Sequence, residues 1–403
     1  MTILVADQIA NVGREALEEA GHHVVAEPSL NEEALVEALR QEQPQVLVVR
    51  STKVPPEALD ASTPLSLVVR AGAGYDTIDV DSAAGRGIYV ANCPGKNSVA
   101  VAELTMGLIV SLDRKIPDNV ADARRGQWNK KTYANAEGIK GRTLGIVGLG
   151  NIGEEVARRA LAFDLDVVAW SRSLTARRAE QLGIGYCESP VDVARSASIV
   201  TLHVASTPDT HHLADRTFFE ALPKESIFIN TTRAAVVDED ALAWALDERH
   251  IRVGLDVVSG EPSAKQASFE HRFAAHPNVY LTHHIGASTQ QAQNATALEA
   301  ARVINTFGET GDVPNCVNLA TQSAATHQIT VRHLDKVGVL ARVLNEMREA
   351  GWNIQEMENK VFSGAKAAVA TMRFDGTITE DMQERIAAHD DVLAVSVIEM
   401  SRR

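Results

Sequence analysis

A glycine cluster between an apolar run and a helical pattern constrains the fold of this chain more than any other feature. The cluster is Gly148-Leu149-Gly150-Asn151-Ile152-Gly153, with the strand-like run Thr143–Gly148 before it and a predicted helix, Glu154–Phe163, after it. In a G-x-G-x-x-G turn the first glycine makes the bend, the second admits a pyrophosphate, and the third lets helix pack on strand. Free N–H groups at the helix start then face the phosphates. The cluster therefore predicts a dinucleotide-binding βαβ unit.

The end of the next predicted strand bears on which dinucleotide binds. Val167–Trp170 is followed by Ser171 and Arg172, where a carboxylate that binds the ribose hydroxyls is usual. A serine beside a guanidinium accommodates a 2′-phosphate, but Arg172 is equally well interpreted as a surface charge, and NAD also binds without the carboxylate. The sequence thus predicts NAD or NADP as cofactor and leaves the choice open.

Short apolar runs alternate with helical patterns before residue 290. The helical patterns include Asn31–Gln41 and Glu239–Ala245. The apolar runs suit strands buried on both faces, and they are Ile3–Ala6, Val46–Val49, Leu67–Val69, Ile88–Val90, Val167–Trp170, Ile199–Val204, Ser226–Asn230 and Val253–Val257. This alternation predicts a doubly wound α/β architecture with parallel sheets.

The C-terminal part has a different order of elements. Residues 319–326 are small and polar and lack periodicity, so they are predicted to form a linker. A β-α-β-β-α-β pattern follows in the runs Ile329–Val331, Leu340–Met347, Ile354–Phe362, Ala367–Phe374, Glu380–His389 and Val392–Met400. This order predicts a ferredoxin-like domain.

Composition excludes several classes of function. A net charge of −14 over 403 residues argues against a nucleic-acid partner. The three cysteines are widely spaced and odd in number, which fits reduced thiols and neither a disulfide framework nor a zinc site. The N-terminus has no basic leader, and the apolar stretch 99–112 is interrupted by Glu103 and too short to span a bilayer. We therefore expect a cytoplasmic protein with no metal and no membrane partner.

Three side chains that suit a carbonyl reduction each follow a strand-like run. Arg233, Glu261 and His284 come shortly after predicted strands that end at residues 230, 257 and 281. Carboxyl ends of strands in a doubly wound sheet face the ligand crevice, so these side chains are expected to converge. Individually they are also explained as a surface arginine, a capping glutamate and a buried histidine. Together they suit acid–base chemistry on a small-molecule substrate.

Longer motifs give the chain a close resemblance to one enzyme family. They are Arg70-Ala71-Gly72-Ala73-Gly74-Tyr75-Asp76, Asn92-Cys93-Pro94-Gly95-Lys96-Asn97-Ser98 with Ala102-Glu103-Leu104, and His203-Val204 followed by Thr207-Pro208. With the glycine cluster, they make the chain resemble the D-isomer-specific 2-hydroxyacid dehydrogenases over essentially its whole length. The resemblance implies a split, flavodoxin-like substrate-binding domain, residues 1–96 and 293–318. A Rossmann NAD(P)-binding domain, residues 97–292, would be inserted into it.

The resemblance implies a role for each candidate residue. His284 is expected as the general acid/base, Glu261 as the carboxylate that raises its pKa, and Arg233 as the clamp on the substrate carboxylate. The family's pattern of a histidine before an apolar residue and Gly-Ala-Ser selects His284 over His283. Asp256 is expected beside the nicotinamide. Further implied cofactor contacts are His203, Val204, Thr207, Thr232 and Gly286, and implied substrate contacts are Arg50, Ser51, Lys53, Ala73, Gly74, Asn97 and Lys130.

Within the family, the chain is most similar to members that act on D-3-phosphoglycerate. The resemblance therefore implies oxidation of that substrate to 3-phosphohydroxypyruvate, the first step of L-serine synthesis. A phosphate needs cations, for which Lys serves as a point charge, and Arg50, Lys53 and Lys130 are the expected sources. Two alternatives stay open. A glyoxylate or hydroxypyruvate reductase would share the catalytic side chains, and a dinucleotide-sensing corepressor would show little turnover.

Residues 327–403 resemble an ACT domain, a fold that binds amino acids at paired interfaces. Gly338, in its first loop, lets a ligand approach the backbone. The resemblance implies L-serine or another amino acid as effector, held by His333 and Asp335 of one subunit and Asn353 of its neighbour. It also implies a homodimer or homotetramer. A purely structural dimerisation domain is the alternative.

Overall fold

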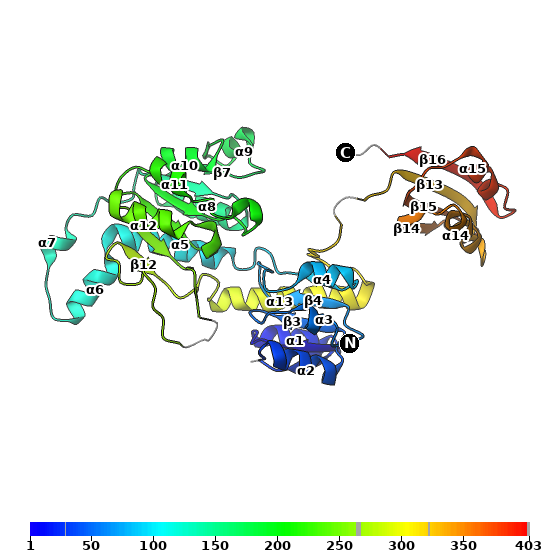
Figure 1. Cartoon of the computed structure of the whole chain (residues 1–403), viewed down its shortest axis with the longest axis horizontal. Helices are drawn as coiled ribbons and strands as arrows, with labels where there is room; N and C mark the ends of the chain where they lie inside the picture. The colour runs from blue at the N-terminus through cyan, green and yellow to red at the C-terminus, as the bar shows by residue number, and fades with distance from the viewer. Residues whose placement is uncertain (29, 263–266, 321–322, 401–403) are drawn as a thin grey trace. The chain divides into compact units, whose positions relative to one another are not determined.

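The computed structural model describes residues 1–28, 30–262, 267–320 and 323–400. The chain forms two compact units, residues 1–318 and the part that begins at Leu319. The predicted linker, 319–326, includes residues 321–322, which lie outside the described residues. Two parallel sheets belong to the first unit and one antiparallel sheet to the second (Figure 1).

The N-terminal sheet has five parallel strands in the order β2-β1-β3-β4-β5, which is the flavodoxin-like order. Its elements are β1 (Thr2–Val5), α1 (Asn11–Glu19), β2 (His23–Ala26), α2 (Glu32–Glu42), β3 (Val46–Val49), α3 (Pro56–Leu59), β4 (Leu67–Arg70), α4 (Val80–Gly85) and β5 (Tyr89–Ala91). Strand β2 was not predicted: its apolar run is only Val24–Ala26, and as an edge strand with exposed end residues it is only partly buried.

The helix α13 (Gln290–Thr310) returns to this N-terminal sheet. Its residues Ala300 and Ile304 lie in the same buried cluster as Ile3 of β1. It also packs closely on α1, where a Cβ on Gly13 would lie 2.7 Å from the Cβ of Ala297. Segments from both ends of the first unit therefore share one core.

The second sheet has seven parallel strands in the order β12-β11-β10-β9-β6-β7-β8. Its strands are β6 (Thr143–Val147), β7 (Asp166–Trp170), β8 (Gly185–Tyr186), β9 (Ile199–Leu202), β10 (Ile227–Asn230), β11 (Arg252–Leu255) and β12 (Val279–Leu281). The intervening helices are α5 (Ser98–Arg114), α8 (Asn151–Ala162), α9 (Ala176–Gln181), α10 (Pro190–Ser196), η1 (Pro208–Thr210), α11 (Arg216–Ala221), η2 (Ala234–Val236) and α12 (Glu239–Glu248). The order reverses between β6 and β9, the switch point at which such sheets bind ligands.

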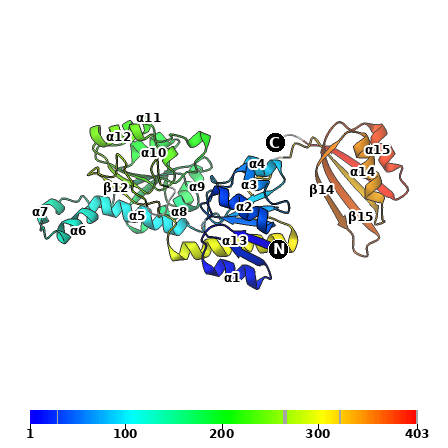
Figure 2. The same ribbon diagram turned by 60° about the horizontal axis from the view of Figure 1, so that its bottom comes forward.

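Two short helices, α6 (Ile116–Arg124) and α7 (Lys130–Tyr133), form an arm that extends from the second sheet (Figures 1 and 2). Neither helix buries a residue. The two helices are joined by a hydrogen bond, which the Tyr133 hydroxyl of α7 donates to Asp122 of α6 at 2.7 Å. Trp128, between the two helices, is 87% exposed.

The C-terminal unit is an antiparallel sheet in the order β14-β15-β13-β16. Its elements are β13 (His327–Leu334), α14 (Val339–Glu349), β14 (Asn353–Val361), β15 (Ala367–Asp375), α15 (Glu380–Ala387) and β16 (Val392–Glu399). Alternate residues of β13, Ile329 and Val331, are buried with Val343 and Met347 of α14 and Ile386 of α15. Within the described chain, no helix is long and apolar enough to cross a bilayer.

Candidate active site

A cavity of about 820 Å³ lies within the first unit and takes its walls from both parallel sheets. Arg50 follows β3 and Gly72 follows β4 on one side, while Arg233 follows β10 and Asp256 follows β11 on the other. These positions are the carboxyl ends of parallel strands, as the sequence motifs predicted. His284, in the loop after β12, completes this group.

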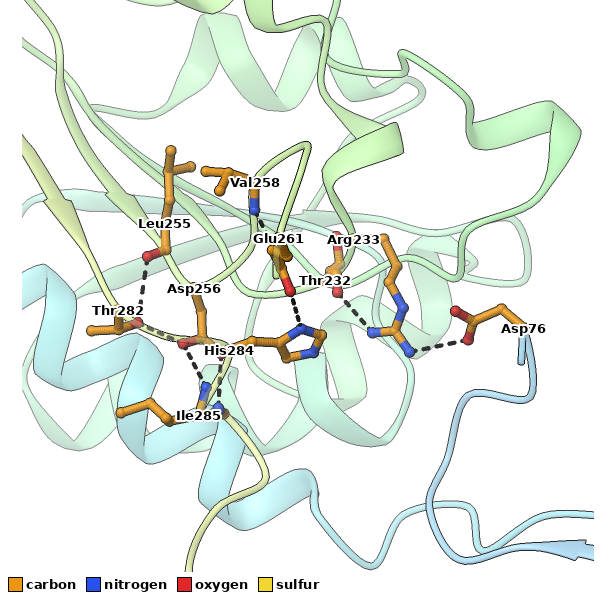
Figure 3. A network of polar contacts seen from close by, with 11 residues as sticks. Asp76, Thr232, Arg233, Leu255, Asp256, Val258, Glu261, Thr282, His284 and Ile285 are labelled. Carbon is orange, nitrogen blue, oxygen red and sulfur yellow. Dashed lines mark hydrogen bonds and ion pairs between the residues drawn. The ribbon is translucent and has the colours of Figure 1, made fainter. Parts of the chain in front are cut away.

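An imidazole–carboxylate pair lies at the cavity wall. Nδ1 of His284 and Oε2 of Glu261 are 2.7 Å apart (Figure 3). This hydrogen bond raises the pKa of His284, against smaller opposing effects of burial and of the Arg233 charge. Burial acts to raise the pKa of Glu261, but the bond from His284 and its charge lower that pKa overall. The pair favours an imidazolium whose Nε2 is free to exchange a proton.

The loop that carries His284 is fastened to the buried side chain of Asp256. Its carboxylate accepts hydrogen bonds from the backbone N–H of Ile285 at 2.9 Å and of Gly286 at 2.7 Å, and from the Thr282 hydroxyl at 2.5 Å (Figure 3). The loop also holds His284 at a φ of 52°, which costs strain in a non-glycine residue. Asp256, predicted to lie beside the nicotinamide, thus has a visible second task in positioning the imidazole.

Arg233 is held by its own loop and by one carboxylate of the N-terminal part. Its Nη1 donates to the carbonyl of Thr232 at 2.9 Å, and its Nη2 donates to Asp76 at 3.2 Å. Asn230 supports the loop, because its side-chain amide donates to the Arg233 carbonyl and its Oδ1 accepts from the N–H and hydroxyl of Thr232. The guanidinium retains further N–H groups for an anionic ligand.

Two more guanidinium groups line the same cavity, those of Arg50 and Arg70. No hydrogen bond or ion pair joins either side chain to a carboxylate within the described part of the chain, although the charge of Asp76 acts on Arg70, and Nε of Arg70 is buried there without a hydrogen-bond partner. Arg70 lies over Gly72, where a Cβ would come within 1.5 Å of its Nη1. Burial lowers the pKa of Arg70, and the charge of Arg233 adds to this effect.

The loop of Arg50 is anchored by Asp7. One oxygen of this carboxylate accepts from the backbone N–H groups of Arg50, Ser51 and Thr52, at 2.7, 2.9 and 2.9 Å. Burial acts to raise the pKa of Asp7, but these amide bonds lower it overall.

Sequence reasoning missed Asp7, Arg70 and Asp76 as site residues. Asp7 lies two residues after the end of β1, and this strand-end position is a local sequence signal that identifies it as a candidate site residue.

The glycine turn fits a dinucleotide by its shape. Gly148 has a φ of 100°, and a Cβ there would lie 2.5 Å from the carbonyl oxygen of His203. A Cβ on Gly153 would lie 2.2 Å from the Gly148 carbonyl oxygen, whereas Gly150 faces open space. Helix α8 begins at Asn151 with Gly150 as its N-cap and no side-chain cap, so its first N–H groups are free for phosphates.

The other predicted cofactor residues lie after β7, after β9 and in the first turn of α8, and they differ in how exposed they are. Ser171 and Arg172 follow β7, and Arg172 is 71% exposed, 3.9 Å from Asp209. His203 follows β9 and is partly buried; desolvation of its ring lowers its pKa to about 3, and its Nε2 lies 3.0 Å from the Thr201 hydroxyl. Val204 and Thr207 continue the same loop, and Thr207 begins η1. Ile152 lies in the first turn of α8.

The predicted substrate residues divide into two groups. Arg50, Ser51 and Asn97 line the cavity, and Gly74 touches the Arg233 guanidinium. Lys53, Ala73 and Lys130 are not among its lining residues. Lys53 is 3.8 Å from Glu32, and Lys130 lies on the arm.

The predicted effector residues lie in the C-terminal unit. His333 is buried, with Nδ1 2.8 Å from the Leu334 carbonyl oxygen and Nε2 3.2 Å from Oδ1 of Asn359. Asp335 and Asn353 are exposed. Among the described residues, no group of three or more His, Cys, Asp or Glu side chains could hold a metal ion.

Comparison with known proteins adds independent findings. The family model for the NAD binding domain of D-isomer specific 2-hydroxyacid dehydrogenase matches residues 106–286. The D-3-phosphoglycerate dehydrogenase of Methanocaldococcus jannaschii is 37% identical over 319 residues, 79% of this chain but only 59% of that protein. The chain therefore spans less than two thirds of that curated relative.

Two solved structures share the fold. An NADPH-dependent glyoxylate/hydroxypyruvate reductase from Sinorhizobium meliloti, in complex with NADP and malonate, is 30% identical with a TM-score of 0.68, covering 78% of this chain and 96% of that one. An NAD⁺-bound 3-phosphoglycerate dehydrogenase from Entamoeba histolytica is 26% identical with a TM-score of 0.66, covering 79% and 99%.

A dinucleotide turn and a proton-transfer pair within one folded unit are what a nicotinamide-dependent dehydrogenase requires, since the cofactor supplies the hydride chemistry and the protein the orientation. That is the class which this fold and site define. The matches narrow it further: the chain belongs to the D-isomer-specific 2-hydroxyacid dehydrogenase family, and residues 106–286 are its NAD-binding domain.

Proposed function

We propose that the protein oxidises D-3-phosphoglycerate to 3-phosphohydroxypyruvate with NAD or NADP, the entry step of L-serine synthesis. The observation that carries the proposal is the pair of guanidinium groups, Arg50 and Arg70, that line the cavity with no hydrogen bond or ion pair to a carboxylate among the described residues. Arg233, in the same cavity, suits the carboxylate that every 2-hydroxy acid has. The phosphate of D-3-phosphoglycerate is a second anion, and it would bind Arg50 and Arg70.

The proton chemistry belongs to His284. Its Nδ1–H donates to Glu261, so in the neutral ring Nε2 can take the proton of the substrate hydroxyl as the carbonyl forms. In the reverse direction the imidazolium returns that proton to the carbonyl oxygen. Arg233 holds the carboxylate and polarises the adjacent carbonyl. The bound nicotinamide supplies or accepts the hydride.

The test compares two substrates that differ only in the phosphate. We expect kcat/KM for 3-phosphohydroxypyruvate to exceed that for hydroxypyruvate by about 100-fold, because two charged hydrogen-bonding groups contribute to one anion. Arg50→Gln and Arg70→Gln should each reduce this preference while changing hydroxypyruvate turnover far less. Equal kcat/KM values for the two substrates would contradict the proposal.

A glyoxylate or hydroxypyruvate reductase is the second candidate. The likeness to the S. meliloti reductase, whose structure contains NADP, favours it together with the Ser171-Arg172 sequence. A monoanionic substrate, however, leaves Arg50 and Arg70 without a bound anion, although the charge of Asp76 acts on Arg70. The same substrate comparison separates the two candidates.

The arm supports a proposal about assembly. Trp128, Ile116 and Val120 are exposed apolar side chains on or between α6 and α7, and such a surface is expected to be covered by another subunit. Lys130, a predicted phosphate ligand, lies on this arm and outside the cavity of its own chain. In the proposed homodimer, the arm would bring Lys130 to the cavity of the neighbouring subunit. A monomer in analytical ultracentrifugation would exclude this arrangement.

The C-terminal unit supports a regulatory role. Its β-α-β-β-α-β order and four-stranded antiparallel sheet are those expected of an ACT domain. We propose that two such domains bind L-serine between them, with the exposed Asp335 from one subunit and Asn353 from the other, while His333, whose ring nitrogens are both engaged inside the fold, supports the strand behind them. An effector of this kind changes activity only if it binds one conformation better than another.

A further inference from the structure

Arg233 is held from two sides of the cavity. Thr232, its neighbour in sequence, accepts from Nη1, whereas Asp76, 157 residues away in the loop after β4, accepts from Nη2 (Figure 3). The two anchors therefore come from the two parallel sheets. No other side chain forms a hydrogen bond or ion pair with this guanidinium within the described residues, so Asp76 is its one side-chain partner there.

The backbone beside this pair is shaped to let it form. A Cβ on Gly74 would lie 2.5 Å from Nη2 of Arg233 and 2.9 Å from Oδ1 of Asp76. Real Cβ atoms do not approach other atoms so closely. A Cβ at position 74 would therefore displace Nη2 of Arg233 and Oδ1 of Asp76. The glycine in the Ala73-Gly74-Tyr75-Asp76 motif is thus explained by the Asp76–Arg233 contact.

The charge of Asp76 suits a lasting contact. Burial acts to raise the pKa of Asp76, but the hydrogen bond and charge of Arg233, helped by the charge of Arg70, lower it overall. The carboxylate is therefore ionised at neutral pH. Its charge acts on Arg70 as well as on Arg233 and so offsets part of the repulsion between these two guanidinium groups.

We propose that Asp76 is a positioning residue for Arg233, an inference that rests on the proposed role of Arg233 as the carboxylate clamp. A guanidinium has five N–H donors. Thr232 and Asp76 each occupy one, which fixes the plane of the group and leaves three for the substrate carboxylate and carbonyl. Asp76 also ties the clamp to the N-terminal sheet, so both sheets define where the substrate carboxylate sits.

The test is a double-mutant cycle measured with whichever 2-oxo acid the wild-type enzyme reduces. Asp76→Asn should raise KM for the 2-oxo acid about tenfold, with a smaller change in kcat and none in the Kd of the cofactor. In an Arg233→Ala background the same substitution should have no further effect on kcat/KM. Gly74→Ala, which collides with the pair, should reproduce the KM change.

Asp79→Asn is the matched control, since Asp79 is in the same loop but caps α4 by accepting from the Ser82 N–H and does not line the cavity. It should leave KM near the wild-type value, and thermal unfolding should show that all variants fold. A tenfold loss from Asp76→Asn in both backgrounds would overturn the proposal, as would a fall in KM, which would mean that Asp76 competes with substrate. Full activity in Arg233→Ala would instead refute the proposed function of Arg233.

Discussion

The two units of this chain differ in how fully each completes a site by itself. In the first unit, His284 is hydrogen-bonded to Glu261, and the carboxylate of Asp256 accepts a hydrogen bond from the Gly286 N–H in the loop that carries His284. In the second unit, both ring nitrogens of His333 are engaged inside the fold, and Asp335 and Asn353 face solvent. A single chain thus assembles a catalytic site, whereas the proposed effector site needs a second surface. Substitutions should therefore act strongly in the first unit and weakly in the second.

The largest effect is expected at the imidazole. His284→Ala should lower kcat by about 10²–10⁴-fold, because a positioned acid/base is lost from the transition state. Cofactor affinity, measured by quenching of protein fluorescence, should stay nearly unchanged. His283→Ala should lose far less, since Glu261 is bonded to His284 and not to its neighbour. Equal losses in the two variants would show that the wrong histidine has been assigned.

A smaller effect, with a diagnostic pH dependence, is expected at Glu261. Its hydrogen bond raises the pKa of His284, so Glu261→Gln should bring that pKa down. Reduction needs the imidazolium and declines as pH rises through this pKa, and the decline should therefore begin at lower pH in the variant. Oxidation needs the neutral ring, and its rise should also move to lower pH. An unshifted pH profile of kcat/KM would exclude the coupling.

Cofactor choice should respond more modestly. Ser171→Asp places a carboxylate where a 2′-phosphate would lie, so the ratio of NADP to NAD use should fall about tenfold. In the present structure, Arg172 is exposed and forms one long ion pair, 3.9 Å, with the exposed Asp209, which a 2′-phosphate would replace. Steady-state kinetics with both cofactors measure the ratio. An unchanged ratio would mean that Arg172 stays in solvent.

The smallest effect is expected in the C-terminal unit. Titration calorimetry with L-serine should give measurable binding to the wild type, weakened by Asn353→Ala, while turnover without serine stays unchanged in that variant. The proposed site is shared, so binding should require the oligomer. Absence of heat with serine, glycine or other amino acids would leave this unit as a structural dimerisation domain.

Much of the first unit could be predicted from the sequence because its features are local. The glycine turn, the buried strands and the strand-end positions of Arg233 and His284 each leave a pattern in consecutive residues. Asp76 could not be assigned this way, because its partner Arg233 is 157 residues distant and only the fold brings the two together. The edge strand β2 likewise offers only a short apolar run, Val24–Ala26.

The candidate contacts on the arm and in the C-terminal unit were harder to place for a related reason. Lys130 is outside the cavity of its own chain, so nothing within one chain decides its role. His333 was predicted as a ligand residue from its loop position, but its burial and its contacts with Leu334 and Asn359 depend on tertiary packing. A site that forms between copies cannot be recognised from the residues of one copy alone.

A crystal structure of the wild-type enzyme with NAD⁺ and D-3-phosphoglycerate tests the central claim most directly. We predict that the substrate carboxylate contacts Arg233, its 2-hydroxyl lies within hydrogen-bonding distance of Nε2 of His284, and its phosphate contacts Arg50 and Arg70. A phosphate bound at Arg233, or one that leaves Arg50 and Arg70 without an anion, would contradict the account.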